Sequence, residues 1–196
     1  MVRFALAACI ALLQLPATAS AAEGRVAATP KRVDLAALVE CRGDLAQFRA
    51  LAPALEDPLQ AVALGWRPLP QVNLFLTEFT LLAPITVFGH VTEHIAFSGD
   101  SILAIIDLPD PRPLARQLEL ETGIDTPAKA MFGKEVRSEE LADPETGEVL
   151  VESMVLAVSN VDSHPGKTLV GCSYSLDLPA EPESPQPVPS IDTVVP

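Results

Sequence analysis

The spacing of apolar residues changes near Val72, from a helical pattern before it to an alternating pattern after it. In the first part, an aspartate precedes each of three short apolar stretches, in the position of a helix N-cap (Asp34, Asp44 and Asp57). Gly43 and Gly65 stand where helices commonly end. The sequence therefore predicts short helices at about 34–42, 45–55 and 58–64.

After Val72 the period of two is typical of half-buried strands. Three segments rich in Ile, Val, Phe and Thr follow one another, at 74–82, 85–97 and 101–107. Pro84 marks a bend or a sheet edge, and Ser98-Gly99-Asp100 provides a hairpin turn. These features predict an antiparallel meander.

A helix and a second antiparallel set are expected next. Pro113 can occupy the first turn of a helix running to about Glu121, with Gly123 after it. Two strands, 134–141 and 148–158, flank a turn between Asp143 and Gly147. In the last strand, 168–178, alternate residues share one face, which we expect to be the core face (Val170, Cys172, Tyr174, Leu176 and Leu178).

These elements give an α+β fold class, in which short N-terminal helices and a middle helix pack on a twisted antiparallel sheet. The order of helices, strands, helix and strands would also fit two αβ halves, although no residue-level repeat establishes them. We expect a single domain at 34–178, which is long enough for one hydrophobic core.

Both ends of the chain differ from this domain. Residues 1–22 have the features of a signal peptide: Arg3, an apolar run over 4–15 that is too short to span a bilayer, and small residues before the cleavage site. Lipid attachment at Cys9 is a less favoured alternative, because the apolar run continues beyond it. A flexible leader is expected at 23–33.

The C-terminal segment, 179–196, combines prolines with acidic residues and lacks a periodic apolar pattern. Such a composition predicts a disordered acidic tail. After signal-peptide cleavage two cysteines remain, Cys41 and Cys172. In an oxidising compartment this pair predicts a disulfide that clamps the first helix to the last strand. We therefore expect a periplasmic protein or, alternatively, a secreted one.

The charge balance excludes several partners. The chain has 26 acidic and 13 basic residues, a formal net charge of −13, and few aromatic residues. Phosphate backbones and anionic membrane surfaces repel such a chain. We therefore expect no nucleic-acid binding and, after signal-peptide cleavage, no stable membrane insertion.

His90, Glu93 and His94 match the H-x-x-E-H pattern of inverted zinc-protease motifs. That chemistry requires a helix, because histidines four residues apart on a strand are ~13 Å apart. The local alternation indicates a strand, so the sequence favours no metal ligand, catalytic residue or cofactor. If zinc did bind, Glu119 or Glu152 is a conceivable third ligand.

Other patterns add little chemistry. No nucleophile-elbow or phosphate-loop motif is present, and nothing in the sequence joins His90, His94 or His164 to a triad. The acidic cluster around 139–148 fails the EF-hand spacing and is interpreted as an exposed hairpin tip. Trp66 is interpreted as a core residue at a helix-to-strand junction.

The sequence thus favours a non-enzymatic exported protein of binding or structural type, which contacts another envelope or secreted protein through its sheet or its proline-rich tail. Two alternatives remain open. One is a zinc-dependent hydrolase that uses His90, Glu93 and His94, and the other is a carrier of a small apolar ligand in the α/β interface.

Overall fold

The computed structural model describes residues 33–143 and 145–179. The expected signal peptide, all but the last residue of the leader, and all but the first residue of the tail lie outside these ranges. Among the described residues, no helix is both long and apolar enough to cross a membrane.

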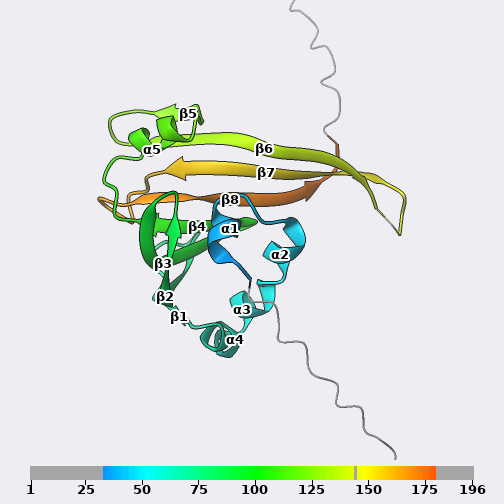
Figure 1. Cartoon of the computed structure of the whole chain (residues 1–196), viewed down its shortest axis with the longest axis horizontal. Helices are drawn as coiled ribbons and strands as arrows, with labels where there is room; N and C mark the ends of the chain where they lie inside the picture. Colours follow the sequence, from blue (N-terminus) through cyan, green and yellow to red (C-terminus); the bar gives the residue numbers. More distant parts are fainter. Residues whose placement is uncertain (1–32, 144, 180–196) are drawn as a thin grey trace, which may run out of the picture. The chain divides into compact units, whose positions relative to one another are not determined.

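Eight strands of the described chain form one antiparallel sheet in the order β1-β2-β3-β4-β8-β7-β6-β5 (Figure 1). Their bounds are β1 Trp66–Pro68, β2 Thr77–Val87, β3 His90–Ser98, β4 Ser101–Ile106, β5 Glu121–Asp125, β6 Ala130–Ala142, β7 Val149–Ser159 and β8 Thr168–Asp177. The first four strands form one meander and the last four a second. Pairing of β4 with β8 joins the two meanders into a single sheet.

The helices are short, and most of the structured chain is sheet. Their bounds are α1 Leu35–Val39, α2 Leu45–Arg49, α3 Ala52–Glu56, α4 Pro58–Ala63 and α5 Arg112–Gln117. The three aspartates expected to cap helices do so. The side chain of Asp34 accepts a hydrogen bond from the Ala37 N–H, Asp44 accepts from Gln47 and Asp57 accepts from Leu59. The α+β prediction therefore holds at the level of short helices with an antiparallel sheet.

The helix expected at 45–55 is divided into α2 and α3. Pro53 explains the break, because proline has no N–H to donate to the carbonyl of Arg49 and its ring crowds that carbonyl. Pro53 instead lies in the first turn of α3, where the missing N–H costs nothing.

The strand expected at 85–97 is also divided, since the chain turns between β2 and β3. Phe88 and Gly89 have φ angles of 48° and 82°, and Val87 pairs with His90 across this two-residue turn. Positive φ at both positions is the geometry of a type I′ hairpin. The strained Phe88 is held by Glu40, whose carboxylate accepts the Phe88 N–H at 2.7 Å.

The expected end of the middle helix and the expected role of Gly123 were both wrong. The middle helix ends at Gln117 rather than near Glu121, and Glu119 takes a φ of 55° just after it. Gly123 does not cap that helix. It lies in β5 where the pairing with β6 shifts register, which is a common place for glycine in a strand.

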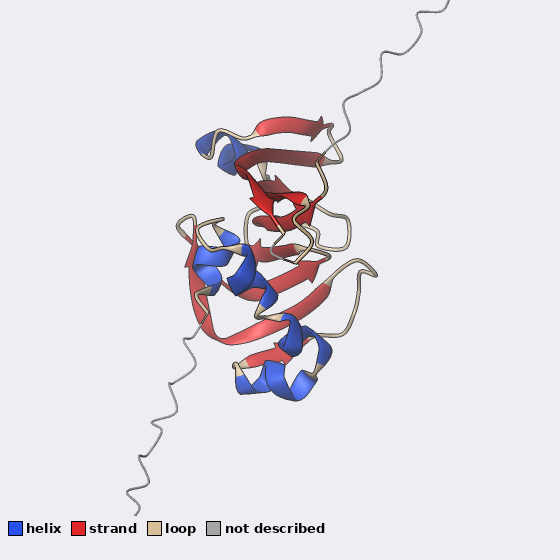
Figure 2. Cartoon of the chain, turned by 90° about the vertical axis from the view of Figure 1, so that its right-hand side faces the viewer, coloured by secondary structure: helices blue, strands red, loops and turns tan. Residues whose placement is uncertain are grey.

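Figure 2 shows helices lying against the strands of the sheet. The main core lies on the face of the sheet that α1 and α2 cover. Leu38, Val39 and Phe48 pack there against Val170, Cys172 and Tyr174 of β8. Trp66 is buried and stacks with Phe97 at a centroid distance of 5.8 Å, as expected for a core residue. The short strand β1, which begins at Trp66, was not expected from the sequence.

Two bonds fasten α1 to the last strand. The sulfur atoms of Cys41 and Cys172 are bonded, joining the chain just after α1 to the core face of β8 as the sequence predicts. The buried hydroxyl of Tyr174 donates a 2.7 Å hydrogen bond to the carbonyl of Leu38. Burial, with a smaller contribution from Asp44, raises the pKa of this phenol well above its usual value. Tyr174 is therefore a donor throughout the ordinary pH range.

Replacing Tyr174 with Phe removes that donor and leaves the Leu38 carbonyl buried without it. We expect Tyr174→Phe to lower the free energy of unfolding by about 1 kcal/mol, with the ring stacking on Phe48 retained. Urea unfolding of the oxidised protein measures the change. An unchanged midpoint would show that water replaces the hydroxyl and that the bond contributes nothing.

Candidate functional site

Three titratable side chains meet on the sheet face opposite the main core. Phe79 and Ile95 point into that core, so their neighbours Glu78 on β2 and His94 on β3 point to the other face. His164 reaches the same place from the loop between β7 and β8. The site thus joins strands of the first meander to a loop of the second.

The three side chains converge on one carboxylate oxygen. Nε2 of His94 lies 2.8 Å from Oε2 of Glu78, and Nε2 of His164 lies 3.1 Å from the same oxygen. One ligand atom from each residue falls within 4.8 Å of the other two. Ligand atoms this close together can bind a single metal ion between them.

Glu78 is unusually placed for a carboxylate. Its side chain is 3% exposed, while those of His164 and His94 are 9% and 29% exposed. Its second oxygen, Oε1, is buried and has no hydrogen-bond partner among the described residues. A buried acceptor without a partner costs about 1 to 3 kcal/mol of stability, and more when it is charged. We therefore expect a ligand to bind at this oxygen.

Strand pairing sets the relation between Glu78 and His94. Glu78 pairs with Ala96 and Thr80 pairs with His94, which makes Glu78 and His94 diagonal neighbours on one face. Thr92 fixes the backbone at this point, because its hydroxyl donates to the Ile105 carbonyl and accepts the His94 N–H at 3.0 Å. These two hydrogen bonds fix the backbone from which the His94 side chain extends.

His164 is oriented by a different set of bonds. Its Nδ1 lies 3.0 Å from the hydroxyl of Ser163, and that hydroxyl accepts a 2.9 Å hydrogen bond from the side-chain amide of Asn73. Metal-binding histidines commonly have such a partner on the nitrogen that does not face the metal. Ser163, His164 and Glu78 also form a hydroxyl, imidazole and carboxylate chain like that of a serine-hydrolase triad, but with the two ring nitrogens exchanged, because Ser163 faces Nδ1 and Glu78 faces Nε2.

The donor set indicates which ions fit. Two imidazole nitrogens and one carboxylate oxygen suit Zn²⁺ and neighbouring transition metals, whereas Ca²⁺ and Mg²⁺ prefer oxygen alone. Ligand atoms at ~2.0–2.1 Å from a tetrahedral Zn²⁺ lie about 3.3 Å apart. The two Nε2 to Oε2 separations, 2.8 and 3.1 Å, would have to widen slightly, and the two Nε2 atoms, which lie within 4.8 Å of each other, would have to settle at the same spacing.

Of the H-x-x-E-H residues, the structure brings only His94 into this cluster. His90 is the first residue of β3 and Glu93 is exposed, on a strand that extends ~13 Å between the two histidines. Neither Glu119 nor Glu152 joins His94 in the described structure. Glu152 instead lies 3.8 Å from Arg137.

Sequence reasoning missed Glu78, His164, Ser163 and Asn73. One local signal was available for Glu78, a carboxylate within the otherwise apolar and Thr-rich segment that forms β2. A charged residue that falls within a strand and becomes buried is a reason to look for a partner. The other three lie in loops, where local pattern carries no such signal.

A depression of about 460 Å³ lies beside His94. Its wall comes mainly from β2, β3 and the end of β4 (Thr80, Pro84, Val91, Thr92, Glu93, His94, Ile105, Asp107 and Lys167). His94 is the most exposed of the three clustered residues, so the cluster is reached from this side.

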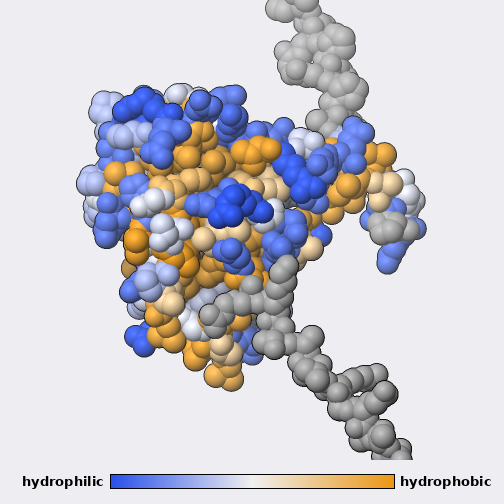
Figure 3. Space-filling view, viewed as in Figure 1, coloured by the Kyte–Doolittle hydropathy of each residue, from blue (hydrophilic) through white to orange (hydrophobic). Residues whose placement is uncertain are grey.

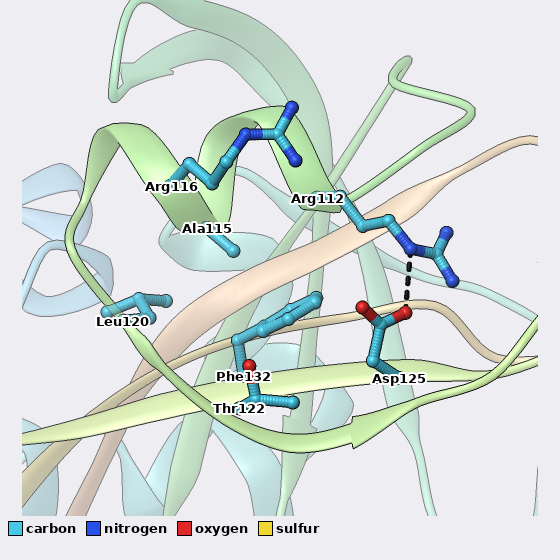
Figure 4. Close-up of a pocket in the computed structure, with 7 residues that line it drawn as sticks. All are labelled: Arg112, Ala115, Arg116, Leu120, Thr122, Asp125 and Phe132. Atoms are coloured by element: carbon cyan, nitrogen blue, oxygen red, sulfur yellow. Dashed lines mark hydrogen bonds and ion pairs between the residues drawn. The ribbon is translucent and has the colours of Figure 1, made fainter.

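A second, smaller pocket of about 230 Å³ lies between α5, β5 and β6 (Figure 4). Its two arginines are Arg112 and Arg116, but Arg112 already binds Asp110 and Asp125. The charge needed for an anion is therefore largely neutralised within the pocket, and the cluster around Glu78 is the stronger candidate.

Comparison of the chain with protein-family models, curated proteins and solved structures found no match.

Proposed function

We propose that this chain is an exported protein that binds one divalent transition-metal ion, with Zn²⁺ the first choice, through Glu78, His94 and His164. The observation that carries the proposal is the buried carboxylate of Glu78, whose Oε2 faces two imidazoles and whose Oε1 has no hydrogen-bond partner within the described part of the chain. A metal ion supplies the missing partner.

Charge supports the same conclusion. The carboxylate of Glu78 lies in a site that is largely removed from water. A buried carboxylate is costly unless it is paired or coordinates a metal. A divalent ion at this point would pair with the carboxylate, and both Glu78 oxygens could face it.

Three protein ligands leave a fourth position for water or a small ligand. This fourth position would face the depression beside His94, through which an ion could reach the site and leave it. It is also where a hydrolytic water would bind. Glu93 lines the same depression, but it is exposed and does not belong to the cluster of Glu78, His94 and His164. The proposed role is therefore binding rather than hydrolysis.

Export is part of this proposal, and the Cys41 to Cys172 disulfide supports it, because such bonds persist mainly in oxidising compartments. Periplasmic residence fits both the bond and the signal-peptide pattern of residues 1–22. Contact with an envelope or secreted partner stays a prediction from the sequence. Polar and apolar side chains contribute about equally to the wall of the depression, so carriage of a small apolar ligand also stays a prediction from the sequence.

The first test is titration of tag-free, chelator-treated protein with Zn²⁺ by calorimetry. We expect one ion per chain and a stabilisation of about 2.7 kcal/mol when free Zn²⁺ is 100 times the dissociation constant. His94→Ala should abolish both effects because it removes one of three ligands. His90→Ala is the matched control, since it removes the same side chain from the same strand outside the cluster, and it should bind like the wild type.

Equal loss in both variants, or binding that survives His94→Ala, would contradict the assignment. A serine-directed organophosphonate tests the competing use of the same residues. Covalent labelling of Ser163 that is lost in His164→Ala, together with no Zn²⁺ binding, would favour a serine hydrolase over a metal-binding protein.

A further inference from the structure

We infer that Ser163, held by Asn73, is a positioning residue whose hydroxyl accommodates either tautomer of His164 and thereby presents Nε2 to the metal. This inference rests on the proposed metal site and adds two residues from separate loops to it. Asn73 lies between β1 and β2, and Ser163 lies between β7 and β8.

The orientation of the Asn73 amide is fixed by its neighbours. Its Oδ1 accepts the backbone N–H of Phe75 at 2.9 Å. A backbone N–H can only donate, so the oxygen of the amide must face Phe75 and the nitrogen must face Ser163. The 2.9 Å contact between Asn73 and Ser163 is therefore a hydrogen bond donated by the amide.

This donation limits what the Ser163 hydroxyl can do toward His164. A hydroxyl has one hydrogen to donate and two lone pairs to accept with, and Asn73 occupies one lone pair. One hydrogen and one lone pair remain for Nδ1 of His164, at 3.0 Å. Ser163 can thus donate to an unprotonated Nδ1 or accept from a protonated one.

Without metal, Nε2 of His164 faces the carboxylate of Glu78 and must carry the hydrogen. In the neutral imidazole Nδ1 then has a lone pair, and the Ser163 hydroxyl donates to it. This arrangement satisfies the ring at both nitrogens.

When a metal binds, Nε2 must offer its lone pair, so the ring hydrogen moves to Nδ1 by exchange with water. The ring stays neutral and its hydrogen count is unchanged. The Ser163 hydroxyl turns and accepts from Nδ1 with its remaining lone pair. An alanine at this position can do neither, and the metal-ready tautomer then loses its partner.

The experiment uses the processed full-length protein with ¹⁵N-labelled histidine. Long-range ¹H–¹⁵N spectra assign the His164 tautomer with and without Zn²⁺, and calorimetry gives the affinity. In the wild type we expect Nε2–H without metal and Nδ1–H with it. Ser163→Ala should weaken Zn²⁺ binding by about 10- to 100-fold, as is typical when a metal ligand loses its hydrogen-bond partner.

Three variants separate positioning from a general structural effect. Ser163→Thr keeps the hydroxyl and should restore most of the affinity. Asn73→Ala keeps the hydroxyl but frees it to rotate, so it should weaken binding less than Ser163→Ala. Ser138→Ala, an exposed serine on β6, is the control and should change neither affinity nor tautomer.

Wild-type affinity in Ser163→Ala, or weakening in Ser163→Thr equal to that in Ser163→Ala, would overturn the positioning role and leave the metal site intact. Absence of Zn²⁺ binding by the wild type would overturn the proposed function and this inference together. If Ser163→Ala does not fold, the Zn²⁺ affinities of Asn73→Ala and Ser163→Thr are compared instead. The positioning role predicts weaker binding by Asn73→Ala, and equal affinities would overturn it.

Discussion

Pairing of β4 with β8 is the constraint on which the rest of the structure depends. It joins the two meanders through strands that are far apart in sequence. At its centre Gly171 lies so close to the β4 backbone that a Cβ would stand 2.0 Å from the carbonyl oxygen of Ile102. The same register sets where β8 begins, at Thr168, whose buried hydroxyl donates to Leu108. The loop before Thr168 therefore carries His164 to the face that holds Glu78 and His94.

The two faces of the sheet have different roles. On one face, α1 and α2 complete an apolar core that the disulfide and Tyr174 fasten to β8. The other face has a smaller apolar cluster that includes Ala96 and Ile105, with the polar cluster beside it. Figure 3 shows polar and apolar side chains mixed over one side of the described domain. The apolar core on the first face stabilises the strands whose other face positions the candidate site.

Local chemistry explains what the sequence predicted well. The aspartate caps and the core face of β8 at Val170, Cys172 and Tyr174 each depend on a few neighbouring residues. Leu178 was wrongly expected on that face: it is exposed, because β8 ends at Asp177. The turn at Phe88 and Gly89 was missed because a bulky residue at positive φ is tolerated only with outside help, here from Glu40. The site was missed because it too depends on residues far apart in sequence. Glu78 is 86 residues from His164, and only the folded sheet brings them together.

The buried carboxylate of Glu78, whose Oε1 lacks a partner among the described residues, marks the proposed metal site. A crystal of the Zn²⁺-loaded protein, with anomalous data collected on both sides of the zinc absorption edge, tests it most directly. We expect one zinc peak within bonding distance of Glu78, His94 and His164, with a water or small ligand completing the coordination. A zinc peak at His90 or at the acidic hairpin, with none at Glu78, would contradict it.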